Sequence, residues 1–156
     1  PFPYIRVYAT SCRINRCYTF FENGEYMKIS GKFDVALEPM ETYATGIEDS
    51  NLGRMSINKI FHGDLSAESK GEMLNVMTPV KGSAGYVAIE QVSGSLSGKH
   101  GTFVLQHYGI MSGGKDKLVL EVVPDSATGE LIGLTGQMKI RIESGQHYYD
   151  FEYTKV

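Results

Sequence analysis

"QMKIRIESGQHYYDFEYT", residues 137–154, alternates apolar and polar side chains on both sides of one turn signal, Ser144-Gly145. The apolar positions before and after that turn are Met138, Ile140, Ile142, Tyr149, Phe151 and Tyr153. A period of two is typical of antiparallel strands that bury one face and leave the other in water. The stretch therefore predicts a β-hairpin and indicates an all-β protein.

The same period recurs along the rest of the chain from Met27 onward, with glycine-containing turns between the apolar runs. Counting the runs predicts eight strands, near residues 28–38, 53–62, 65–78, 84–93, 100–110, 116–123, 137–143 and 146–154. Many short strands joined to their sequence neighbours favour a closed antiparallel barrel, because closure removes exposed strand edges. An eight-stranded barrel has an interior that side chains fill or that holds one small ligand. Residues 124–136 interrupt the alternation and are expected to form a loop, with one helical turn, that covers an end of the barrel.

The composition is that of one globular domain, with 156 residues of which 42% are hydrophobic and 21% charged. A net charge of −3 argues against a nucleic-acid partner, because there is no excess of basic side chains to neutralise phosphates. A membrane partner is not expected either, since no apolar run reaches the roughly 18 residues of a spanning helix. Both cysteines, Cys12 and Cys17, lie near the N-terminus, which favours a reducing compartment and a cytoplasmic location.

Residues 1–26 show no regular period, so this N-terminal extension is expected to lie outside the barrel domain of residues 27–156. The four residues Asn23-Gly24-Glu25-Tyr26 could be encoded with GGAG shortly before the ATG of Met27, as in a bacterial ribosome-binding site. One hypothesis is therefore that Met27 is the natural start and that residues 1–26 are non-native. The alternative is an edge strand or a flexible arm, since chain termini are often poorly ordered.

Polar side chains interrupt the apolar runs of the central strands, and six of them are candidate ligand-binding residues: Glu72, Tyr86, Glu90, Gln106, His107 and Glu121. Both faces of these strands look largely buried, so one face is expected to line the lumen. The other is expected to meet residues 1–26 or a second copy of the chain, as in a homo-oligomer. An unpaired buried carboxylate is costly, so each glutamate must be exposed, paired or protonated. Convergence of these groups in the lumen predicts an acid/base or ligand-orienting site, and the alternative is that they only satisfy one another.

Gln106 and His107 are adjacent in sequence, so their side chains must point to opposite faces of one strand. His107 shares its face with Phe103 and Leu105, which predicts that His107 points inward and that Gln106 points outward.

Other partial matches to catalytic or binding motifs are excluded by the residues around them. Residues 109–115 have the spacing of a phosphate-binding loop as far as its lysine. Asp116 stands where that motif needs a Ser or Thr to bind magnesium, and a strand follows where the motif needs a helix. Residues 94–98 place Leu96 where a serine nucleophile would stand. The histidines lack the short spacing of metal ligands, so neither a metal nor a cofactor is expected.

Several segments, in one order, resemble a bacterial family of domains of unknown function, family 3224. They are "LGRMSINKIFHGDLSAESKGEML", "GSAGYVAIEQVSGSLSGKHGTFVLQHYGIMSGG", "VVPDSATGELIGLTGQMKI" and "GQHYYDFEY". The resemblance covers about residues 27–156 and implies a small closed barrel of the allene oxide cyclase-like type. It implies no reaction, because the function of the family is not established, and analogy of fold alone does not supply one.

Three functions remain open at this stage. The first is a module that binds a small apolar ligand in the lumen. The second is an isomerase or cyclase-type enzyme that uses a carboxylate or His107 as acid/base. The third is a packed barrel with a structural or assembly role. A solid core would exclude the first two, a lone polar group in an open cavity favours binding, and a carboxylate within hydrogen-bond reach of His107 favours catalysis.

Overall fold

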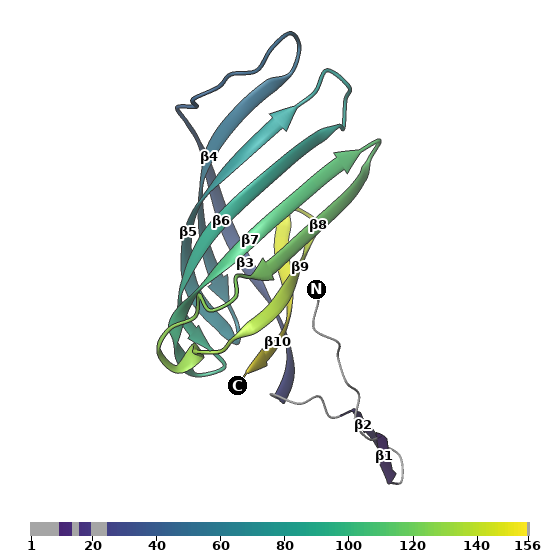
Figure 1. The fold of residues 1–156 in the computed structure, drawn as a ribbon, viewed down its shortest axis with the longest axis vertical. Coiled ribbons are helices and arrows are strands. Elements are labelled where there is room, and N and C mark those ends of the chain that lie inside the picture. The colour runs from purple at the N-terminus through teal and green to yellow at the C-terminus, as the bar shows by residue number, and fades with distance from the viewer. Residues whose placement is uncertain (1–9, 14–15, 20–24, 156) are drawn as a thin grey trace.

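Eight antiparallel strands close into a barrel in the computed structural model, which describes residues 10–13, 16–19 and 25–155 (Figure 1). The barrel strands are β3 (Glu25–Met40), β4 (Asn51–His62), β5 (Leu65–Met77), β6 (Ala84–Leu96), β7 (Lys99–Ser112), β8 (Lys115–Val122), β9 (Thr135–Glu143) and β10 (Gln146–Lys155). Each corresponds to one of the eight strands predicted from the alternation, with small differences at the ends. The prediction of an all-β closed barrel is confirmed.

Each barrel strand pairs with its neighbours in sequence, and β10 pairs with β3 to complete the ring. The ladder between β10 and β3 runs from His147 opposite Phe33 to Lys155 opposite Glu25. The β8–β9 seam is much shorter, with Glu121 and Gln137 as its paired residues. The chain leaves β8 at this seam and enters the predicted irregular loop.

That loop lies at the lower end of the barrel in Figure 1 and contains the single-turn helix η1 (Gly129–Leu131). It adds Leu131 and Leu134, each 1% exposed, to the hydrophobic core. The other core residues, with 8% exposure or less, include Phe33, Phe61, Leu65, Val92, Phe103, Leu105, Leu120, Tyr149, Phe151 and Tyr153. The lower half of the barrel is therefore packed solid, and the loop contributes to that packing as the interrupted alternation predicted.

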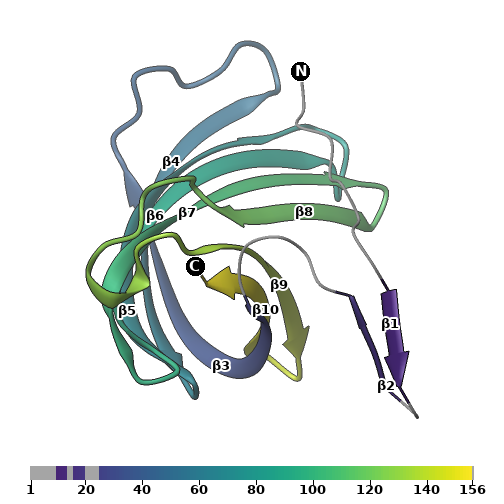
Figure 2. The same cartoon turned by 60° about the horizontal axis from the view of Figure 1, so that its bottom comes forward.

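The N-terminal part described by the structure is a separate two-stranded antiparallel sheet of β1 (Thr10–Arg13) and β2 (Arg16–Thr19), visible in Figure 2. Among the described residues, these two strands pair with each other in a sheet distinct from that of the barrel. Residues 1–9, 14–15 and 20–24 lie outside the described residues. The ladder of β3 begins two positions before Met27, with Glu25 opposite Lys155. The hypothesis that Met27 is the natural start stays a prediction.

The central strands carry apolar side chains on their outward face. Leu74, Val87, Tyr108 and Val119 lie opposite one another across β5 to β8, and 36% to 58% of each side chain is exposed. The outward face of these strands is therefore exposed in the single chain, and its expected cover by residues 1–26 or by a second copy of the chain stays a prediction. No helix among the described residues is long and apolar enough to span a membrane.

Candidate functional site

A cavity of about 790 Å³ occupies the half of the barrel opposite the packed core. Its walls are the upper parts of the strands in Figure 1 and consist largely of aliphatic and methionine side chains, among them Leu37, Met55, Ile57, Met73 and Met111. The volume lies within the range of known small-molecule sites, which are mostly apolar with a few polar groups. The lumen is thus divided into a filled lower half and an open upper half.

A layer of polar side chains lies between the two halves. Lys59, Ser69, Glu90 and His107 come one each from β4, β5, β6 and β7, and all four point inward. Their exposed fractions are 6%, 3%, 0% and 3%. On each strand the next inward residue toward the lower end belongs to the packed core, and Lys59 and His107 also line the cavity. The layer therefore forms the floor of the cavity.

Glu90 is the centre of this buried cluster. Its Oε2 accepts hydrogen bonds from Lys59 Nζ at 2.7 Å and from His107 Nε2 at 2.8 Å, and its Oε1 accepts one from the Ser69 hydroxyl. Burial acts to raise the pKa of Glu90. The hydrogen bond from His107, the charge and hydrogen bond of Lys59 and the bond from Ser69 outweigh it and lower the pKa to about 2. Glu90 is therefore an ionised carboxylate at neutral pH.

Lys59 is held by aromatic rings as well as by the carboxylate. Its Nζ lies 5.2 Å from the ring centre of Phe33 and 5.7 Å from that of Phe61. A cation near an aromatic ring is attracted by the negative charge density of the ring face, more strongly when water is excluded. The two rings and Glu90 together compensate a charge that would otherwise be costly in an apolar core.

Small residues on the neighbouring strands leave room for the cluster. Gly71 lies opposite Glu90 in the β5–β6 ladder, and Ala88 lies opposite His107 in the β6–β7 ladder. A Cβ atom added to Gly71 would lie 2.3 Å from the carbonyl oxygen of Ile89 and 2.8 Å from Cα of Glu90. Any larger residue at position 71 would therefore push apart the two strands that carry Ser69 and Glu90.

Three of the six predicted site residues lie inside the barrel. Glu90 and His107 meet in the buried cluster, as the prediction of a carboxylate–histidine pair requires. Tyr86 forms part of the cavity wall, and a Cβ at Gly109 would lie 2.1 Å from its ring. Burial, followed by the charge of Asp116, raises the pKa of Tyr86, so its phenol remains protonated at neutral pH.

The other three predicted residues lie on the outer surface. Glu72 accepts hydrogen bonds from the Arg54 guanidinium, at 2.6 Å for the shorter one, and 54% of its side chain is exposed. Gln106 lies opposite Glu121 in the β7–β8 ladder beside a shallow groove of about 100 Å³. The inward position of His107 and the outward position of Gln106 agree with the alternation, whereas the structure does not bring Glu72, Gln106 or Glu121 to the cavity.

Sequence reasoning missed Lys59 and Ser69, and for Lys59 a signal was available. Lys59 has the same parity as Ile57 and Phe61, so a lysine stands on the apolar, inward face of its strand. A charged residue at such a position is almost never fully buried without a partner, which points to a carboxylate elsewhere in the lumen. Ser69 gives no comparable signal, since serine is compatible with either face.

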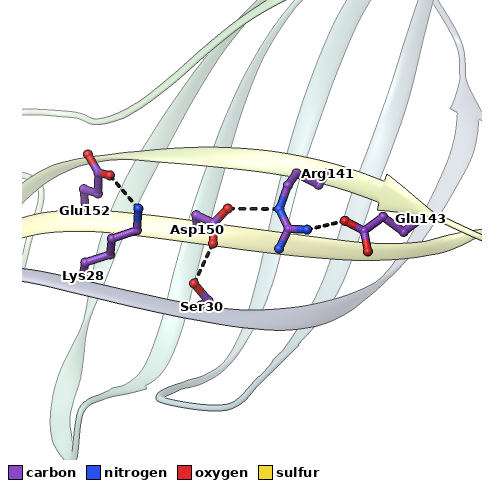
Figure 3. A network of polar contacts seen from close by, with 6 residues as sticks. All are labelled: Lys28, Ser30, Arg141, Glu143, Asp150 and Glu152. Carbon is purple, nitrogen blue, oxygen red and sulfur yellow. Dashed lines mark hydrogen bonds and ion pairs between the residues drawn. The ribbon is translucent and has the colours of Figure 1, made fainter.

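A second polar network lies outside the barrel, on β3, β9 and β10. Figure 3 shows its members: Lys28, Ser30, Arg141, Glu143, Asp150 and Glu152. Asp150 accepts hydrogen bonds from the Ser30 hydroxyl at 2.5 Å and from Arg141 Nε at 3.0 Å, and Arg141 also pairs with Glu143. The hydrogen bond from Ser30 is the largest cause that lowers the pKa of Asp150, burial opposes it, and the hydrogen bond and charge of Arg141 lower the pKa further. Because 46% of the Arg141 side chain is exposed, water competes for these contacts.

The part of the chain that the structure describes contains no group of three or more His, Cys, Asp and Glu side chains that could hold a metal ion. The Lys59–Ser69–Glu90–His107 cluster, with one carboxylate and one imidazole, is thus a hydrogen-bonded site with acid/base capacity.

Comparison with known proteins shows the family of the chain and a similar solved structure. A model of the DUF3224 family, described as protein of unknown function, matches residues 29–153. The chain is also similar to the crystal structure of a protein of unknown function from the DUF3224 family of Shewanella oneidensis MR-1. The TM-score is 0.82 and the identity 58%, over 85% of this chain and 99% of that chain. No curated protein matches.

Proposed function

The chain belongs to the DUF3224 family, and from the geometry of its barrel we propose that it binds a small apolar molecule in the upper half of the lumen. The observation that carries this proposal is the cavity of about 790 Å³, with mostly apolar walls and a polar floor. Such a combination buries an apolar ligand and orients it through a few polar contacts. The cavity counts against a barrel that is filled throughout and serves only in assembly. We also propose a bacterial setting, which the relative from Shewanella oneidensis supports, and a cytoplasmic location, which the position of the two cysteines favours.

A second candidate function is acid/base catalysis of the isomerase or cyclase type in the same cavity. It is favoured by the 2.8 Å contact between Glu90 Oε2 and His107 Nε2, because a carboxylate that orients an imidazole is a common arrangement for a general base. In such a reaction the imidazole would take a proton from one carbon of the substrate and return it to another. No net oxidation or added reactant is needed.

Ligand binding is tested by filling the cavity. Met73 lines the cavity, whereas the adjacent Leu74 points outward and is 58% exposed. In a thermal-shift screen with a library of lipids and aromatic compounds, ligands are expected to raise the melting temperature of the unmodified protein and of Leu74→Trp. They are expected to have no effect on Met73→Trp. Equal shifts in both variants would place binding outside the lumen and contradict the proposal.

Catalysis is tested with a ligand from that screen. Incubation in deuterated water is expected to introduce deuterium into the ligand at the carbon that exchanges its proton, as measured by mass spectrometry. His107→Gln is expected to stop the exchange and to leave ligand binding measurable. A ligand that binds but never exchanges leaves binding as the function and excludes the second candidate.

A further inference from the structure

The two ring nitrogens of His107 are in different situations. Nε2 is hydrogen-bonded to Glu90, whereas Nδ1 has no hydrogen-bond partner within residues 25–155. Every buried side-chain nitrogen or oxygen in that part of the chain does have a partner. Nδ1 is therefore not a buried atom, and since His107 lines the cavity, it is toward the cavity that Nδ1 is open. It is the unsatisfied polar atom that the cluster presents to a ligand.

The bonds of Glu90 determine which kind of contact Nδ1 can make. An ionised carboxylate only accepts hydrogen bonds, so the proton on the His107 side of the contact must be on Nε2. In a neutral imidazole the other nitrogen is then an acceptor. The single charge of Lys59 already balances the single charge of Glu90 at 2.7 Å. With a neutral imidazole, the residues of this floor, which are 0% to 6% exposed, carry no net charge.

We infer that Nδ1 of His107 selects the ligand by accepting a hydrogen bond, and that the ligand is an uncharged apolar phenol or alcohol. This inference rests on the proposed binding function. A carboxylate of the same shape is disfavoured, because it has no proton to donate and because Lys59 is already engaged by Glu90 and by the rings of Phe33 and Phe61. Lys117 and Asp116 both line the cavity and carry opposite charges, so together they add no net charge to its walls.

The test compares three head groups on two apolar skeletons at pH 7. The probes are 2-naphthol, 2-methoxynaphthalene and 2-naphthoate, and 1-decanol, methyl decyl ether and decanoate, with Kd measured by calorimetry. Each hydroxyl compound is expected to bind about tenfold more tightly than its ether, which corresponds to one net hydrogen bond of about 1.4 kcal/mol. An ether that binds within twofold of its alcohol on both skeletons overturns the inference and leaves ligand binding intact. Failure of all six probes to bind overturns the proposed function as well.

Two variants test the role of the cluster directly. His107→Phe keeps a ring but removes the acceptor, so the ratio of the hydroxyl and ether affinities is expected to fall to about one. Glu90→Gln keeps an oxygen for Lys59 and His107 but leaves the charge of Lys59 uncompensated, so the two carboxylate probes are expected to gain at least tenfold. His62→Phe is the matched control, because His62 is exposed and contacts Asp34 at 2.8 Å.

Two results of these variant experiments would overturn the inference. A hydroxyl preference that survives in His107→Phe overturns the inference. If that variant fails to fold, Glu90→Gln decides alone, and an unchanged order of the three head groups in it overturns the inference. Circular dichroism and thermal melting of each variant establish which proteins are folded before any affinity is compared.

Discussion

The buried cluster around Glu90 and the outer network around Asp150 use the same chemical groups in different surroundings. Glu90 accepts hydrogen bonds from a lysine and a serine, and Asp150 accepts them from an arginine and a serine. The Glu90 side chain is 0% exposed, whereas that of Asp150 is 22% exposed and its arginine 46%. The hydrogen bonds of a carboxylate therefore do not by themselves determine how much it contributes to the stability of the fold. Water competes for the hydrogen bonds of Asp150 and is excluded from those of Glu90.

The pKa values of both carboxyl groups are lowered, but burial and hydrogen bonding contribute to the two values in a different order of size. For Glu90, a large opposing effect of burial is overcome by three partners, and the pKa falls to about 2. For Asp150, the hydrogen bond from Ser30 is the largest effect and exceeds the opposing effect of burial, which comes second. A buried carboxylate depends on all its partners, since losing one leaves a charge that water cannot reach. This difference leads to four predictions.

The largest effect is expected from removing the buried cation. Lys59→Met leaves the Glu90 carboxylate in the core without its counter-charge, and the free energy of unfolding is expected to fall by about 3–5 kcal/mol. Urea denaturation at pH 7 measures the loss. The control is Lys28→Met, because the Lys28 side chain is 58% exposed and contacts Glu152 at 3.1 Å on the outer surface. Similar losses in the two variants would show that burial does not govern the cluster.

The second prediction concerns pH. A carboxyl group whose pKa is lower in the folded than in the unfolded state stabilises the fold above its ordinary pKa. That stability is lost as the pH falls toward the folded value. For Glu90 the window is from 4.5 down to about 2, and the corresponding free energy of unfolding is about 3 kcal/mol. The difference in stability between the unmodified protein and Glu90→Gln is therefore expected to shrink across this window in acid denaturation. A constant difference from pH 5 to pH 2 would mean that the Glu90 pKa is not lowered.

The third prediction tests the space that the cluster needs. Gly71→Ala is expected to lower the free energy of unfolding by about 1–3 kcal/mol, because the new Cβ meets backbone atoms of the strand that carries Glu90. Gly85→Ala is the control, since the nearest atom to its new Cβ is a side-chain carbon of Ile110 at 3.3 Å. Thermal melting of both variants measures the difference. Equal melting temperatures would mean that β5 and β6 tolerate the extra atom.

The smallest effect is expected on the outer network. Asp150→Asn removes an ion pair that water and salt screen, so the melting temperature is expected to change by much less than in Lys59→Met. In 1 M sodium chloride the remaining difference is expected to disappear, whereas the loss caused by Lys59→Met persists because the cluster is inaccessible to ions. A loss in Asp150→Asn that is insensitive to salt would place this network among the essential contacts of the barrel.

Much of the fold could be predicted because the alternation of side chains directly reflects strand geometry. The alternation of apolar and polar residues from Met138 to Tyr153 predicted β9 and β10, and its interruption at residues 124–136 predicted the loop that contains η1. The site was predicted in part. The apolar Phe103 and Leu105 on the same face of β7 were enough to predict that His107 points inward. Glu72 and Glu121 also share their faces with apolar residues, as Glu90 does, but they lie outside. Parity tells which residues share a face and leaves open which face is the lumen.

The sequence by itself determined the number of strands, their order of pairing with sequence neighbours and the opposite directions of Gln106 and His107, because each is a local property of an extended chain. Only the tertiary structure decided that Lys59 of β4 and His107 of β7 meet the same carboxylate, since these strands are not neighbours in the ring. It also decided that the lumen is filled below this cluster and open above it. Both outcomes depend on how far each strand is shifted along the closed barrel, and on the volumes of side chains from all eight strands.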